Sequence, residues 1–103
     1  MRIAVEVSRL LAYRVAWMQS RGLVPNYEAS MAKTFASDVG QAVARLAVNI
    51  TGLGALVAPK GSEFAEHSPG FRYMDCLRLT IAQGTGEVQR NIIAQRGLGL
   101  PRG

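Results

Sequence analysis

The chain has 103 residues, 49% hydrophobic and 18% charged, which excludes disordered and fibrous proteins and is enough for one small domain. The net charge of +5 and the pI of about 10.2 suit an anionic partner, but the arginines are scattered, which favours a solvated basic surface. Cys76 is the only cysteine, so an intramolecular disulfide is excluded and a reducing cytoplasm is expected.

Residues 2–21 are predicted to form a helix, because apolar residues recur every three or four positions along one face. That face consists of Ala4, Val7, Leu11, Val15 and Met18. Arg14 falls among hydrophobic residues on its flank, beside Ile3, Leu10 and Trp17. We expect its guanidinium to reach solvent or to pair with a carboxylate.

The turn 22–26 contains Pro25 and offers Asn26 as a helix cap, and residues 27–57 then form the longest predicted helix. Its expected apolar face comprises Ala32, Phe35, Val39, Val43, Leu46, Ile50, Leu53 and Val57. Thr34, Asp38, Gln41, Arg45 and Asn49 are expected on the opposite side. The most apolar window, residues 46–59, is too short to cross a bilayer, so no membrane association and a cytoplasmic location are expected.

Residues 58–70 are expected to form a polar loop that contains Glu63, Glu66 and His67. The two glutamates could be a paired acid and base, and His67 could activate Cys76. Nothing in the sequence positions any of them, so solvated loop side chains and a buried, inert thiol are favoured. No metal site is predicted.

A third helix is predicted over residues 71–83, followed by a break at Gly84-Thr85 and a fourth helix. Thr85 is a favourable N-cap, and Glu87 lies in the first turn, where a carboxylate meets the positive end of the helix dipole. Gly97 and Gly99 are expected to permit left-handed backbone, and Pro101 to end the helix. The expected fold is therefore all-α, an antiparallel bundle of about four helices that forms one domain over residues 1–103.

Residues 84–94, Gly-Thr-Gly-Glu-Val-Gln-Arg-Asn-Ile-Ile-Ala, and residues 96–102, Arg-Gly-Leu-Gly-Leu-Pro-Arg, resemble the C-terminal signature of the acyl-CoA dehydrogenases. These are flavin enzymes that desaturate acyl-CoA thioesters. Residues 9–17 and 29–37 are similar to the same family's bundle helices. The resemblance covers nearly the whole chain but only the C-terminal part of the family's final helical domain. The family's N-terminal helical and middle β domains have no counterpart, so the chain alone is not expected to bind flavin tightly or to turn over.

The resemblance also implies site residues. Gln83 stands where many members carry the glutamate base, and a carboxamide cannot accept that proton, so the base lies elsewhere or the activity is altered. Thr85 and Glu87 match positions near the flavin ribityl and phosphate groups. Asn49 and Gly52 match positions near a neighbouring subunit's flavin, although Leu53 replaces a glycine there. For Thr85 and Glu87 the alternative is an N-cap and a partner of the helix dipole, and for Gly52 and Gly54 it is a frayed helix end.

The implied function is that of a C-terminal domain that supports FAD binding and oligomer formation and closes the acyl-CoA site. FAD, acyl-CoA and an electron-transfer flavoprotein are the implied cofactor and partners of the complete enzyme. One alternative is a stand-alone helical assembly module that pairs with a full-length dehydrogenase subunit as a homo- or hetero-oligomer. The other is a basic helical nucleic-acid binder, an alternative that only the pI supports.

Overall fold

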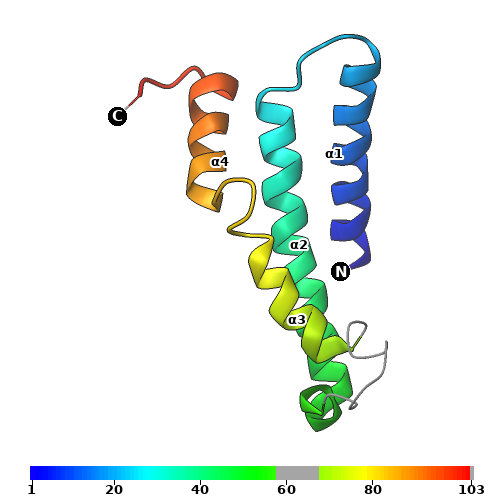
Figure 1. Cartoon of the computed structure of the whole chain (residues 1–103). Coiled ribbons are helices and arrows are strands. Elements are labelled where there is room, and N and C mark those ends of the chain that lie inside the picture. The colour runs from blue at the N-terminus through cyan, green and yellow to red at the C-terminus, as the bar shows by residue number, and fades with distance from the viewer. Residues whose placement is uncertain (58–67, 103) are drawn as a thin grey trace.

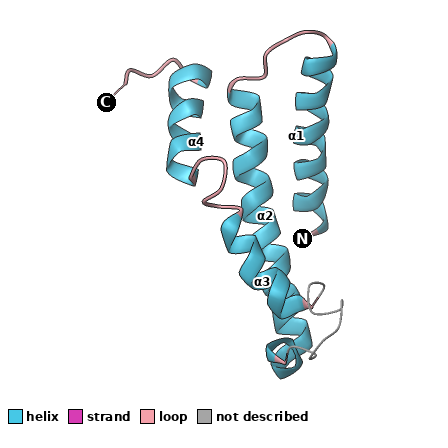
Figure 2. Cartoon of the chain, in the orientation of Figure 1, coloured by secondary structure: helices cyan, strands magenta, loops and turns pink. Residues whose placement is uncertain are grey.

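The computed structural model describes residues 1–57 and 68–102, and every regular element in these two ranges is helical (Figure 2). The elements are α1 (Arg2–Ser20), α2 (Tyr27–Thr51), the 3₁₀ turn η1 (Gly52–Leu56), α3 (Pro69–Arg78), α4 (Gly86–Ile92) and the π-helical turn η3 (Ile93–Gly97). The predicted all-α fold is confirmed.

Helix α2 is the central element, because α1, α3, α4 and η3 all pack against it. Figure 1 shows α1 antiparallel to α2 on one side of its N-terminal half and α4 on the other side. Helix α3 crosses the C-terminal half of α2. The result is a thin assembly of 49 × 32 × 25 Å rather than a closed bundle.

The buried face of α2 is built from small residues rather than from the large apolar ones. Ser30, Ser37 and Ala44 follow one another at seven-residue intervals and are all buried. By contrast, Ile50 and Leu53 of the predicted apolar face are 77% and 83% exposed. The predicted core face is thus wrong for this end of the helix. Small side chains let α3 and α4 approach closely, and no described element covers the larger ones.

Two helix boundaries differ from the prediction. Helix α2 ends at Thr51 rather than at residue 57, because Gly52 adopts a left-handed backbone with a φ of 63°. Helix α3 begins at Pro69, since the Ser68 hydroxyl accepts a hydrogen bond from the Phe71 N–H at 3.2 Å. It ends at Arg78, five residues before its predicted end at Gln83.

The first turn of α3 lies directly against η1. A Cβ added to Gly70 would lie 2.1 Å from the carbonyl oxygen of Ala55, which is far inside contact distance. Gly70 was expected in a loop. The structure instead places it in α3, where the missing side chain allows the helix to approach η1. The loop residues Glu63, Glu66 and His67 lie outside the described residues.

The start of α2 meets the end of the chain's helical part. The Asn26 side chain makes no cap hydrogen bond to α2, contrary to the prediction, and instead accepts one from Arg96 at 2.7 Å. Gly99 is left-handed as expected, with a φ of 69°, but Gly97 is not among the residues with positive φ. A Cβ at Gly97 would lie 3.1 Å from the Tyr27 ring, so close approach is the reason for a glycine there.

Arg14 satisfies both alternatives that its sequence position left open. Its side chain is 60% exposed, and its guanidinium lies 3.8 Å from the carboxylate of Glu28, whose side chain is only 9% exposed. The pair connects α1 to the first turn of α2.

The segment formed by α2 and η1, Tyr27–Leu56, is long and apolar enough to span a membrane when judged by length and composition. Central helices of water-soluble proteins meet the same criterion, so length and composition are only weak evidence that this segment spans a membrane. The segment also carries Glu28, Lys33, Asp38 and Arg45 along its length.

Candidate functional site

The candidate site is the turn between α3 and α4, residues 79–85, which we call the α3–α4 turn. Gln83 has a φ of 61° and Gly84 a φ of 96°, so two successive residues adopt left-handed backbone. In the described ranges, Gln83 is the one non-glycine residue with positive φ. For a residue with a Cβ this conformation costs about 1–2 kcal/mol, so surrounding contacts must hold it.

Two side chains hold the carbonyl groups of these left-handed residues. Lys33 of α2 donates from Nζ to the Gly84 carbonyl oxygen at 2.8 Å. Gln89 of α4 is buried and donates from Nε2 to the Gln83 carbonyl oxygen at 2.9 Å. A Cβ at Gly84 would lie 2.7 Å from the same Nε2 atom. Glycine at this position therefore leaves room for the Gln89 amide.

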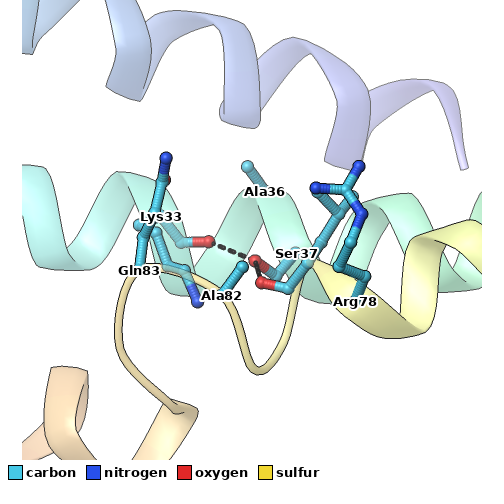
Figure 3. Close-up of a pocket in the computed structure, with 7 residues that line it drawn as sticks. Lys33, Ala36, Ser37, Arg78, Ala82 and Gln83 are labelled. Carbon is cyan, nitrogen blue, oxygen red and sulfur yellow. Dashed lines mark hydrogen bonds between the residues drawn. The ribbon is translucent and has the colours of Figure 1, made fainter.

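Further polar side chains of α2 contact the same turn at four-residue intervals. Ser37 Oγ lies 3.2 Å from the Leu79 carbonyl oxygen and 2.9 Å from that of Lys33, and it shares its one hydrogen between them (Figure 3). Gln41 Nε2 lies 3.5 Å from the Thr80 hydroxyl. Lys33, Ser37 and Gln41 thus form a polar ladder on one side of α2. Gln41 was predicted on the side of α2 opposite the apolar face, and the structure shows that this residue contacts the turn.

A pocket of about 220 Å³ lies beside this ladder. It is lined by Lys33, Ala36, Ser37, Arg78, Leu79, Ala82 and Gln83 (Figure 3). Its two cations are both engaged, Lys33 with Gly84 and Arg78 with Asp75 at 3.1 Å. No carboxylate lines the pocket. Since Gln83 is an amide, the pocket can position a polar group but contains no base.

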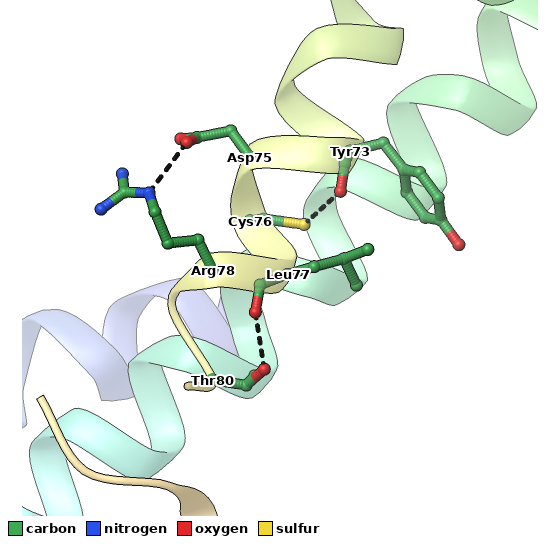
Figure 4. A network of polar contacts seen from close by, with 6 residues as sticks. All are labelled: Tyr73, Asp75, Cys76, Leu77, Arg78 and Thr80. Atoms are coloured by element: carbon green, nitrogen blue, oxygen red, sulfur yellow. Dashed lines mark hydrogen bonds and ion pairs between the residues drawn. The ribbon is translucent and has the colours of Figure 1, made fainter. Parts of the chain in front are cut away.

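The end of α3 that leads into this turn is held by contacts within the helix. The Thr80 hydroxyl donates to the Leu77 carbonyl at 2.7 Å, and Cys76 Sγ donates to the Tyr73 carbonyl at 3.0 Å (Figure 4). The backbone N–H groups of Leu79 and Thr80 also donate to the Cys76 and Leu77 carbonyls, so backbone and side-chain contacts together close the end of the helix. Cys76 is buried, as predicted.

Thr85 begins α4 as predicted, because its Oγ1 accepts from the Val88 N–H at 3.5 Å. The pKa of Glu87 is lowered by a hydrogen bond from its own backbone N–H, then by one from the Thr85 side chain, and also by the charge of Arg90. Desolvation opposes these causes and outweighs the effect of Arg90 alone. The Thr85 hydroxyl therefore both accepts and donates within this turn of the helix.

Asn49 and Gly52 lie far from Thr85 and Glu87. Asn49 is about 24 Å further along α2 than Lys33, at 1.5 Å per residue. Asn49 is exposed, and a Cβ at Gly52 would have no atom within 4 Å, so this backbone is open to approach. One chain thus brings together Gln83, Thr85 and Glu87 but not the second pair.

Lys33 and Gln89 are site residues that the sequence analysis missed. Lys33, Ser37 and Gln41 share a four-residue spacing among small residues, and this signal could have shown that they form one polar face. Gln89 could not have been found in this way, because its role depends on the left-handed turn. The described residues contain no cluster of three metal-ligating side chains.

The family model described as acyl-CoA dehydrogenase, C-terminal domain, matches residues 1–98. An acyl-CoA dehydrogenase of Bacillus subtilis is 38% identical over 100 residues, and the mitochondrial short-chain specific acyl-CoA dehydrogenase of Rattus norvegicus is 34% identical over 95 residues. These alignments cover 96% and 91% of this chain, but only 24% and 21% of the two relatives.

A solved structure agrees with the sequence comparison. The crystal structure of the ChsE4-ChsE5 complex from Mycobacterium tuberculosis contains a chain that superposes with a TM-score of 0.77 at 34% identity. The superposition covers 99% of this chain and 26% of the other. The chain therefore spans about a quarter of the length of the proteins it resembles.

Proposed function

The chain belongs to the acyl-CoA dehydrogenase family as its C-terminal domain, and we propose that it serves a flavin-dependent enzyme that desaturates acyl-CoA thioesters. The observation that carries this proposal is the family match, which extends through the α3–α4 turn and the start of α4. The role is to contribute to FAD binding, to oligomer formation and to the acyl-CoA site of the complete enzyme.

Bound FAD would supply the hydride acceptor. The residues of this chain fit a contribution to its binding rather than a complete site. Thr85 and Glu87 present a hydroxyl and a carboxylate, but the hydroxyl already donates a hydrogen bond to the carboxylate. Asn49 and Gly52 are accessible only at a distant surface, which suits contact with the flavin of a neighbouring subunit.

Gln83 has no role as a base, since its amide cannot accept the α-proton of a thioester. In this proposal it lines the acyl-CoA site, and the base comes from residues outside this chain. Electron-transfer flavoprotein is the proposed electron acceptor, and the cytoplasm the proposed location. Further copies of this chain or a related dehydrogenase subunit are the proposed oligomer partners. The ChsE4-ChsE5 complex supports an assembly of more than one kind of subunit.

The first test is the intact mass and absorption spectrum of the native protein purified from its source. A mass several-fold above 11.1 kDa, with flavin absorption that bleaches when acyl-CoA is added without oxygen, would support the proposal. A flavin-free product that acyl-CoA leaves unchanged would contradict it.

A matched pair of variants then tests the flavin contact. In the flavin-containing protein, Thr85→Val should weaken FAD binding about 2- to 10-fold, as expected for the loss of one hydrogen bond. Ser20→Ala removes an exposed hydroxyl that bonds only the Trp17 carbonyl of α1, and it should leave the affinity unchanged. Equal effects of the two variants would argue against a role of Thr85 at the flavin.

One alternative is supported by a specific observation. Ile3, Leu10 and Trp17, which we call the α1 outer seam, recur every seven residues and are 80%, 61% and 56% exposed. Such a stripe is typical of a helix that packs against another helix. A native mass of 11.1 kDa, together with co-purification of a flavoprotein, would favour an assembly module that pairs with a complete dehydrogenase subunit.

A further inference from the structure

Two hydrogen-bond donors from other residues hold the strained backbone at Gln83 and Gly84. Its carbonyl oxygen accepts from Gln89 at 2.9 Å, and the next carbonyl oxygen, that of Gly84, accepts from Lys33 at 2.8 Å. These two donors come from different helices, α4 and α2, on opposite sides of the turn in sequence. Left-handed backbone at a residue with a Cβ persists only where its surroundings hold it.

The hydrogen bond donated from α2 is the stronger of the two. Lys33 is a cation, and a hydrogen bond from a charged group is roughly twice as strong as one between neutral groups. Its contact spans 51 positions of the sequence, so it ties the turn to the central helix rather than to a neighbouring residue. Ser37 and Gln41 continue the same ladder, but they contact Leu79 and Thr80, before the left-handed residues.

We infer that Lys33 and Gln89 are positioning residues that lock the left-handed Gln83–Gly84 backbone and so fix the direction in which residue 83 and the start of α4 face the bound flavin and acyl-CoA. The part of this inference that concerns flavin and acyl-CoA rests on the proposed function. The lock itself does not, because it consists of contacts within the chain.

The lock can be measured by NMR on the 103-residue chain. The intraresidue HN–Hα NOE of Gln83 should be strong in the wild type, because positive φ brings these two atoms together. Lys33→Met keeps the aliphatic stem but removes the donor. It should weaken this NOE and speed amide exchange at Val88 and Gln89, whose N–H groups donate to Thr85 at the start of α4, by tenfold or more, while exchange in α1 stays unchanged.

Three variants make the result decisive. Lys33→Arg keeps a charged donor and should restore the NOE. Gln89→Leu keeps the buried volume and should loosen the turn as Lys33→Met does. Arg45→Met removes an exposed cation from the same helix and should change nothing at the turn. A wild-type Gln83 without the NOE, or a turn equally ordered in Lys33→Met and Arg45→Met, would overturn the inference.

The functional consequence is tested in the flavin-containing form. If the correct turn is populated one-tenth of the time, the apparent FAD dissociation constant rises tenfold, since affinity scales with the competent fraction. Lys33→Met should therefore weaken FAD binding in proportion to its loss of left-handed population. An unchanged affinity in a variant whose turn has loosened would refute the positioning role. A wild type that binds no flavin would instead refute the proposed function and leave the NMR result standing.

Discussion

At the scale of single residues, Thr85 and Glu87 behave as the sequence predicts, because their geometry is local. A hydroxyl before a helix and a carboxylate in its first turn follow from three consecutive positions. Gln83 and Lys33 were beyond such reasoning. The left-handed backbone of Gln83 and Gly84 is held by Gln89, 6 positions after Gln83, and by Lys33, 51 positions before Gly84, and only the folded chain brings these partners together.

The carboxyl group of Glu87 provides a residue-scale prediction. Its pKa is lowered from 4.5 by its own backbone N–H and by Thr85, so Glu87 should titrate below that value in the folded chain. Because the folded pKa is depressed, the stabilisation is present above the unfolded pKa and is lost as pH falls through the folded pKa. Thr85→Val should raise the pKa toward 4.5, as followed by the Glu87 side-chain carboxyl shift in an NMR titration.

Ser20→Ala is a suitable control for this titration, because it removes a hydroxyl that bonds the Trp17 carbonyl of α1. The pKa of Glu87 should stay lowered in this variant. If Glu87 kept its depressed pKa without the Thr85 hydroxyl, the hydrogen bond between them would not be a cause of the shift.

At the scale of elements, the existence and order of the helices were predictable, but their contact faces were not. Apolar spacing located α1 and α2 well. It failed to find the buried face of α2, where Ser37 and Ala44 are buried while Ile50 is exposed. Spacing alone assumes that large apolar side chains face the core. Here the close approach of α3 selects small residues, and that choice depends on which helices are neighbours.

Gly70 tests the contact between α3 and η1. In Gly70→Ala, the new Cβ would meet the Ala55 carbonyl oxygen at 2.1 Å, so the two elements must separate. We expect unfolding to become easier by about 1–3 kcal/mol, the usual cost of overpacking. This loss corresponds to a fall in Tm of about 4–8 °C for each kcal/mol in a domain of this size.

Gly54→Ala is the matched control in η1. Its new Cβ would lie 3.5 Å from the Thr51 methyl group, an ordinary contact, so thermal unfolding should change little. Equal Tm values for the two variants, measured by circular dichroism, would show that α3 does not pack on η1 as described.

At the scale of the whole molecule, the chain exposes more surface than a closed monomer does. Its accessible surface is 7647 Å², against about 5,600 Å² expected for a compact monomer of this mass. Its radius of gyration is 16.7 Å, against about 13 Å for a compact domain of this length. The sequence indicated this openness only through the family resemblance, because composition does not report which faces lack a partner.

The α1 outer seam leads to a prediction at this scale. If the seam packs against another subunit, Leu10→Glu combined with Trp17→Glu should lower the solution mass measured by light scattering, because burying two carboxylates is unfavourable. Ala12→Glu combined with Ala16→Glu places the same two charges at exposed positions of α1 that lie away from the seam, and should leave the mass unchanged. An assembly that survives the double substitution would be held by another surface.

Cys76 offers a way to observe how this open structure moves. Its thiol is 6% exposed and lines an apolar pocket of about 540 Å³ between α1, α2 and α3. A thiol reagent should react faster when α3 lifts from α2, so the alkylation rate divided by that of the unfolded chain gives an upper limit for the fraction of time spent open. The alkylation rate of Cys76 therefore reports on the detachment of α3 from α2. This rate should slow whenever a ligand or another subunit holds that helix in place.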